Sequence, residues 1–394
     1  MQESSLSLRQ LLALVFAGMT AAALRQLPRQ SAAAAQGAGA WLSAVVVLPV
    51  VLVLCWAVTG ALRGMPKGCG YGETLRGVLG PWLGGGLTII YMVWTVLILG
   101  SGLSQCGERL KVLGYNGWGR AVFLLLALLL AVKMAMGRVH SFARAVEIFF
   151  LALTAALVLV VLLAAFRVEP GNLLPVGGGA LKGGLPALEV ACAGVPAAFL
   201  TGWVRKSPEE SGRRKLIRWT VWAVVVLTAV QAVCIGAFGW QVTALQRLPL
   251  FEAAKQVGVT GAFQRVEALV AALLVMSDVA LFGLTLLSLR GQSQALWHGI
   301  TPDRIIPAAA VLGAGIAFFM SRSQTVVRFL GELLLPCMSI VLGFAVPLIV
   351  ILVKKIREHF GWTVTSCAGN KPETEDIVAE KKDAKSKEKN QKKC

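Results

Sequence analysis

The most unusual residue of this 394-residue chain is Asp278, a carboxylate near the middle of the apolar segment 268–289. A carboxylate at the centre of a bilayer costs about 2.5–3.5 kcal/mol, so such a residue normally faces a cavity or a partner. We expect Asp278, together with the adjacent Ser277, to bind an amine or to exchange a proton. The alternative is that Asp278 is neutral and makes a structural hydrogen bond to a neighbouring helix.

Two other apolar segments contain residues that interrupt a helix, and a broken helix exposes backbone groups that lipid cannot satisfy. The first segment, 7–36, is predicted to break at Gly18–Ala21, before Pro28. The second, 185–204, is predicted to break at Ala191–Pro196. Pro28 and Pro196 are 196 − 28 = 168 residues apart, about half of the apolar region. Interrupted segments at matching positions of two halves indicate a secondary-transporter fold with its ligand site at the breaks.

Each break offers a different kind of backbone group. A half-helix that starts after the first break would direct its N-terminal amides at an anionic group such as a carboxylate. Pro196 lacks an N–H and frees a carbonyl one turn back, which can accept from an ammonium group or bind a cation. The alternatives are that Gly18 only permits close helix packing and that Pro196 only kinks its helix. The residues expected to contact a ligand here are Gly18, Met19, Thr20, Ala193, Gly194 and Val195.

Aromatic and charged side chains in other apolar segments extend this prediction. Tyr91 and Trp94 are expected to line the ligand site, with simple core packing as the alternative. Four charges at similar depth are expected to form an outer gate, in which Arg25 or Arg29 pairs with Glu189 or Glu332. The alternative is that each of these side chains extends to the lipid headgroups. Arg144 and Glu147 are expected to pair locally at helical spacing.

Other kinds of chemistry have no support in the sequence. It contains no Ser-His-Asp order, no phosphate-binding glycine loop that opens a helix and no metal-ligand spacing. We therefore expect neither an enzyme nor a cofactor or metal site. The net charge of +18 comes from bases in short loops, without a basic and aromatic surface module, which argues against nucleic-acid binding.

The composition identifies the elements that must position these residues. The chain is 56% hydrophobic and 15% charged, whereas soluble domains have about 25% charged residues. The fold class is therefore all-α and integral to the membrane. About ten segments approach the roughly 20 residues needed to cross a bilayer: 7–36, 40–62, 82–107, 118–137, 142–166, 185–204, 215–239, 264–289, 304–320 and 326–353.

Two short helices are expected outside these spans, one within 64–81 at the inner surface and one within 240–262 on the outside. Basic clusters at 205–218 and after residue 353 place the N- and C-termini in the cytoplasm, although the outer loops also hold bases, including Arg109. The chain divides into a transmembrane domain, 1–360, and a charged tail, 361–394, that is expected to be disordered.

Three stretches resemble spore germination permeases, the B subunits of germinant receptors within the amino acid–polyamine–organocation superfamily. Ala40-Trp41-Leu42-Ser43 resembles the start of the second span in that family. Gly72-Glu73-Thr74-Leu75 with Leu79-Gly80 is similar to its loop before the third span. Leu248-Pro249-Leu250 and the stretch from Gly261 to Leu269 resemble the start of its eighth span. The resemblance covers roughly residues 5–355.

This resemblance implies ten helices in two inverted five-helix repeats, with the broken helices first and sixth. It also implies a nutrient-sensing role in the spore inner membrane, with an A subunit and a lipoprotein C subunit as partners. We expect the ligand to be a small nutrient, an amino acid. The competing hypotheses are a proton- or sodium-coupled amino-acid transporter and a scaffold with an inactive pocket.

Overall fold

The computed structural model describes residues 6–63, 69–112, 114, 117–176, 179–204, 210–256, 266–297 and 301–360. The predicted tail, 361–394, lies outside the described residues. Among them the secondary structure is helical, with no strand beyond an isolated bridge between Leu6 and Val204. The predicted all-α class is therefore confirmed.

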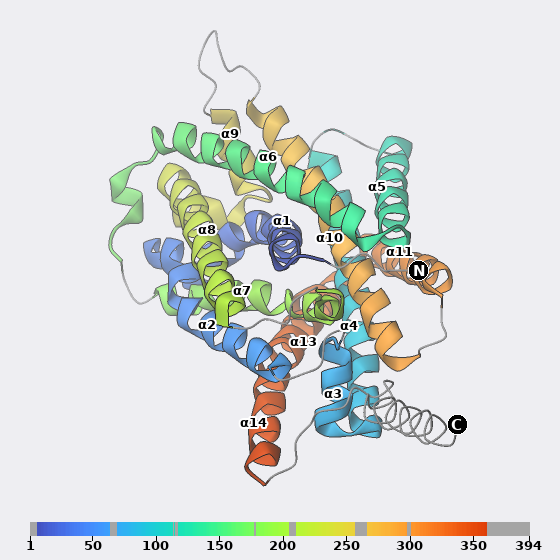
Figure 1. The fold of residues 1–394 in the computed structure, drawn as a ribbon. Helices are drawn as coiled ribbons and strands as arrows, with labels where there is room; N and C mark the ends of the chain where they lie inside the picture. The colour runs from blue at the N-terminus through green and yellow to red at the C-terminus, as the bar shows by residue number, and fades with distance from the viewer. Residues whose placement is uncertain are drawn as a thin grey trace, which may run out of the picture.

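Ten long helical segments follow the predicted spans, and Figure 1 shows their arrangement. Nine of those described are long and apolar enough to cross a membrane, and α1 adds a tenth helix of 28 residues. The segments are α1 (Leu8–Ala35), α2 (Ser43–Leu62), α4 (Pro81–Val112), α5 (Trp118–Met136), α6 (Val139–Ala165), α7 (Gly179–Cys192) with η3 (Val195–Trp203), α8 (Glu210–Leu245), α10 (Val266–Leu296), α11 (Pro302–Arg322), and a last span of α12 (Gln324–Val326), η4 (Val327–Leu334), α13 (Leu335–Ile340), η5 (Val341–Ala345) and α14 (Val346–His359).

Four shorter helices connect these segments: η1 (Ala38–Leu42), α3 (Tyr71–Leu79), η2 (Pro170–Leu173) and α9 (Pro249–Gln256). The predicted short helices within 64–81 and 240–262 are thus present as α3 and α9. Each has a buried apolar face and a Glu in its first turn, with a basic residue in its last turn. That charge order favours the helix dipole at both ends.

The predicted break in the first span is wrong, because α1 runs through Gly18, Met19 and Thr20 as one helix. Ser7 starts it with a capping box, in which Ser7 and Gln10 satisfy each other's backbone N–H. Gly18 instead permits close packing, since a β-carbon there would lie 2.9 Å from Leu284 Cδ2 of α10. This is the alternative that the sequence left open.

The predicted break in the sixth span is present. Helix α7 ends at Cys192, Ala193 and Gly194 form a turn, and the 3-10 helix η3 continues from Val195 with Pro196 in its first turn. Proline is favourable at a helix start, where its missing N–H would have no partner. The break therefore forms where proline can begin the second half-helix.

Helix α1 lies at the centre of the fold (Figure 1). It packs against α7 and α8 on one side and against α6 and α10 on the other. Helix α4 packs in turn against α10 and α11. The predicted inverted repeats stay a prediction.

Candidate functional site

Backbone hydrogen bonds at the break between α7 and η3 change from helical to tighter spacing. Ala193 N–H donates to Glu189 O at 2.9 Å, but Gly194 N–H donates only three residues back, to Ala191 O at 3.2 Å. Pro196 has no N–H to donate to the carbonyls of Cys192 or Ala193. Gly194 O accepts from Ala197 N–H at 3.0 Å. The carbonyls of Cys192 and Ala193 are thus the acceptors that Pro196 leaves without its N–H, within an apolar span.

The break is covered on two sides by other spans. A β-carbon at Gly194 would lie 3.5 Å from Met19 Cγ of α1. On another side, a β-carbon at Gly343 in the π-helical η5 would lie 2.5 Å from Cys192 Cβ and 2.8 Å from Cys192 O. Only glycine fits at position 343 without displacing the break. The structure therefore brings together three predicted ligand residues, Met19, Ala193 and Gly194, and adds Gly343.

Tyr91 and Trp94 belong to a fully buried aromatic cluster on the same side of the break as η5. The Tyr91 ring lies 5.2 Å from Phe199 of η3 and 5.8 Å from Trp94, between ring centroids. The Tyr91 hydroxyl donates to Leu342 O of η5. Both side chains thus pack in the core, as in the stated alternative, and a ligand-lining role for them stays a prediction.

Asp278 forms an ion pair with Arg109 of α4, and only 1% and 7% of their side chains are exposed. The adjacent Ser277 donates a hydrogen bond to Ala17 O of α1 at 2.7 Å. Assigning Arg109 to an outer loop was wrong, because α4 continues to Val112. The polar residues Ser101, Gln105 and Arg109, spaced four apart, were a signal that this face of α4 is buried against partners.

The predicted ligand residues do not form one site. Arg109, which contacts Asp278, and Tyr91 are 18 residues apart on the same helix α4, which corresponds to about 27 Å at 1.5 Å per residue. A small nutrient cannot touch both Asp278 and Tyr91. The candidate site therefore contracts to the break, with Met19 and the surrounding helices.

The outer gate is not formed by the described side chains. Arg29 and Glu332 are exposed and Glu189 is partly buried, and no described ion pair joins any of these three to another. The side chains of Arg25 and Thr20 lie outside the description, so a gate built on Arg25 stays a prediction.

The expected local pair of Arg144 and Glu147 is wrong. Glu147 pairs instead with Arg9 of α1, with 2.9 Å between Arg9 Nε and Glu147 Oε1. This ion pair joins the N-terminal turns of α1 to α6 across 138 residues of sequence. Local helical spacing therefore predicted the wrong partner, because tertiary packing brought a second base closer.

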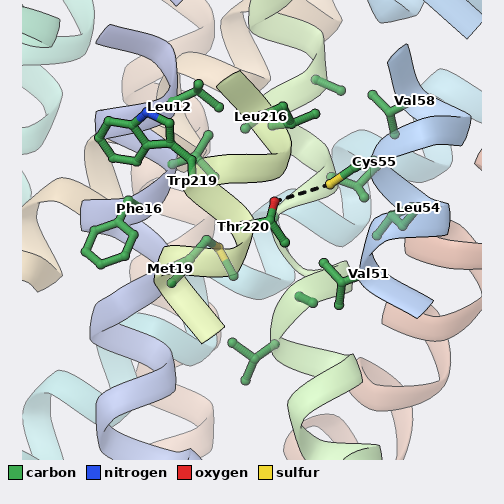
Figure 2. Close-up of a pocket in the computed structure, with 18 of the residues that line it drawn as sticks. Leu12, Phe16, Met19, Val51, Leu54, Cys55, Val58, Leu216, Trp219 and Thr220 are labelled. Carbon is green, nitrogen blue, oxygen red and sulfur yellow. Dashed lines mark hydrogen bonds between the residues drawn. The ribbon is translucent and has the colours of Figure 1, made fainter. Parts of the chain in front are cut away.

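A cavity of about 290 Å³ lies between α1, α2, α7–η3 and α8 (Figure 2). Its walls are mainly aliphatic, with Phe16 and Trp219 on one side. Cys55 Sγ and Thr220 Oγ1 approach to 3.5 Å between α2 and α8. Met19 and Gly194 border this cavity, so the break has one apolar, hollow side and one packed side.

A buried polar network, missed by the sequence interpretation, joins the same four helices. Gln231 of α8 donates to Ser43 Oγ of α2 at 2.7 Å and to Ser31 Oγ of α1 at 3.1 Å. Ser31 donates in turn to Gly183 O of α7 at 3.1 Å. All three side chains are fully buried. The other amide atom of Gln231, Oε1, is buried without a hydrogen-bond partner among the described residues. The network therefore links the four helices but is only partly satisfied.

The described residues thus define an integral membrane protein of long helices, in which the sixth span is interrupted at Ala193–Gly194 and α8 is kinked at Gly239. A family model described as "spore germination protein" matches residues 5–296. The chain belongs to this spore germination protein family. No curated protein matches it.

A solved structure that resembles the chain is that of the Eremococcus coleocola manganese transporter in complex with an aromatic bis-isothiourea substituted compound. It has a TM-score of 0.49 and 12% sequence identity, over 86% of this chain and 76% of the transporter chain. At this distance the likeness carries no argument about function. Among the described residues, no cluster of three or more His, Cys, Asp or Glu side chains could hold a metal ion.

Proposed function

We propose that this chain is the nutrient-sensing membrane subunit of a spore germinant receptor, and that it binds a small nutrient, an amino acid, at the break between α7 and η3. The observation that carries the proposal is the interrupted backbone at Ala193–Gly194, within an apolar span of a spore germination family protein. Backbone acceptors without helical partners can bind an ammonium group where lipid and aliphatic side chains cannot.

The hollow side of the break opens only on an apolar cavity, so a polar nutrient would need a rearrangement of the covered sides. Met19 covers Gly194, and the face toward η5 is closely packed at Gly343. A nutrient would therefore bind better to a second arrangement in which α1 or the last span has moved. A ligand shifts such an equilibrium by its difference in affinity for the two states, and the partner subunits would respond to the shift.

The A subunit and the lipoprotein C subunit are the proposed partners, and the spore inner membrane is the proposed location. Both chain ends are proposed to lie in the cytoplasm. Exposed bases at the start of α8 support this orientation. Leu216, at the start of α8, lines the same cavity as Leu8, at the start of α1, and Leu62, at the end of α2, so these ends lie on one side of the bundle. Lys354 of α14 contacts Ala61 at this same end. Cytoplasmic ends are enriched in Lys and Arg.

The second candidate is a transporter that couples amino-acid uptake to protons or sodium. The observation in its favour is the buried Arg109–Asp278 ion pair. Ionisable residues inside membrane helices often mark ion or proton pathways.

Spores and proteoliposomes separate the two candidates. Spores that lack this chain should lose their germination response to one nutrient, and the wild-type chain should restore it. In proteoliposomes, labelled amino acids should show no saturable, gradient-driven uptake. Uptake of that kind would favour the transporter, whereas an unchanged nutrient response with Gly194→Leu would support a scaffold.

A further inference from the structure

The cavity between α1, α2, α7–η3 and α8 is elongated along the membrane direction. Its wall on α8 runs from Leu216 to Leu227, about 16 Å at 1.5 Å per helical residue. Half of a bilayer's hydrocarbon core of about 30 Å is about 15 Å. On α2 the wall is longer, from Ala44 to Leu62, about 27 Å at 1.5 Å per residue. The cavity is therefore at least as deep as one leaflet, which is the depth that an extended acyl chain occupies.

The chemistry of this cavity does not suit a zwitterionic nutrient. Among the described residues that line it, none is charged. Its three threonines already use their hydroxyls: Thr59 donates to Cys55 O at 2.7 Å, Thr201 donates to Ala198 O at 2.6 Å, and Thr220 lies 3.5 Å from Cys55 Sγ. Away from the backbone of the break at Ala191–Val195, a buried ammonium or carboxylate group would lack partners there. The walls favour an apolar chain.

The end of the cavity at Leu216 lies on the same turns of α8 as four exposed bases. Arg213, Arg214, Lys215 and Arg218 are exposed in the first turns of α8. None of these four takes part in a described ion pair. Trp219 lines the cavity one turn from Leu216 (Figure 2). Tryptophan and basic side chains together are typical of the level of lipid headgroups.

We infer that this cavity holds one acyl chain of an anionic phospholipid, with the headgroup phosphate at the bases that begin α8. The deep part of the cavity reaches Met19 and Gly194. The lipid chain would therefore support the break from its hollow side. This inference does not depend on which nutrient the break binds.

Native mass spectrometry of the full chain tests the inference after reconstitution with phosphatidylglycerol and phosphatidylcholine. The wild type should retain one phosphatidylglycerol molecule on release from the bilayer. Ala223→Phe, which fills the cavity, should lower this retention at least fivefold. Val225→Phe, on the lipid-facing side of the same helix, should leave it unchanged. Thr220→Leu is the milder filling variant if Ala223→Phe fails to fold.

A charge test addresses the headgroup separately. The double variant Lys215→Gln with Arg218→Gln should lower the preference for phosphatidylglycerol roughly 30-fold, at about 1 kcal/mol per base and 1.4 kcal/mol per tenfold. Lys133→Gln with Arg138→Gln, exposed bases in the last turn of α5 and just before α6, should leave the preference unchanged. A wild type that retains no phospholipid, retains both lipids equally, or is insensitive to cavity filling would overturn the inference.

Discussion

Removal of the Asp278 charge should strongly destabilise the fold. Asp278→Asn keeps the size of the side chain but leaves the buried Arg109 guanidinium without its carboxylate. Breaking a buried ion pair by removing one partner costs about 3–5 kcal/mol, because the remaining charge is not compensated. By contrast, Glu252→Gln breaks an exposed pair with Lys255 at 3.2 Å and should cost less than about 1 kcal/mol.

A second change should then restore part of the lost stability. Adding Arg109→Met to Asp278→Asn removes the stranded charge, and replacing a whole buried pair is often nearly neutral. The double variant should therefore recover at least about 2 kcal/mol of the loss. Reversible unfolding of the purified protein in mixed micelles, followed by circular dichroism, measures these free energies. The reasoning is refuted if Asp278→Asn costs no more than the Glu252→Gln control, or if Arg109→Met adds to the loss.

Two further changes test the packing around the break and the end of α2. Gly343→Ala should lower the free energy of unfolding by about 1–3 kcal/mol through overpacking, because its methyl group would lie 2.5 Å from Cys192 Cβ. It should also weaken the nutrient response of spores. The control Gly86→Ala meets no atom within 4 Å and should change neither the unfolding free energy nor the nutrient response. Lys354→Met should lower the free energy of unfolding in micelles by about 1–3 kcal/mol, because the Lys354 ammonium group donates to Ala61 O at 2.9 Å at the C-terminus of α2. A decrease below about 0.5 kcal/mol would exclude a capping role for Lys354.

The positions of the helices could be predicted because they depend on local sequence. Apolar runs of about 20 residues must form helices in a bilayer, since no other open structure satisfies the backbone. The break at Ala193–Gly194 was predicted from Pro196, which cannot donate a helical hydrogen bond. Proline alone does not decide such a break, since Pro28 and Pro186 lie inside the continuous helices α1 and α7.

The contacts of Gly18 and Asp278 could not be predicted in the same way. Glycine permits either a break or close packing, and only the position of Leu284 on α10 decides between them. The partner of Asp278 is Arg109, 169 residues earlier in the chain. The apolar run of α4 ends before Arg109 although its helix continues, so hydropathy alone placed this base in a loop.

Equilibrium binding of labelled amino acids to the purified chain in nanodiscs tests the proposed nutrient site most directly. At least one amino acid should bind saturably to the wild type and to Gly86→Leu, a substitution at an open surface of α4. Binding should be lost in Gly194→Leu, whose larger side chain occupies the space between the break and Met19. Saturable binding that survives Gly194→Leu, or no binding of any amino acid to the wild type, would contradict the account.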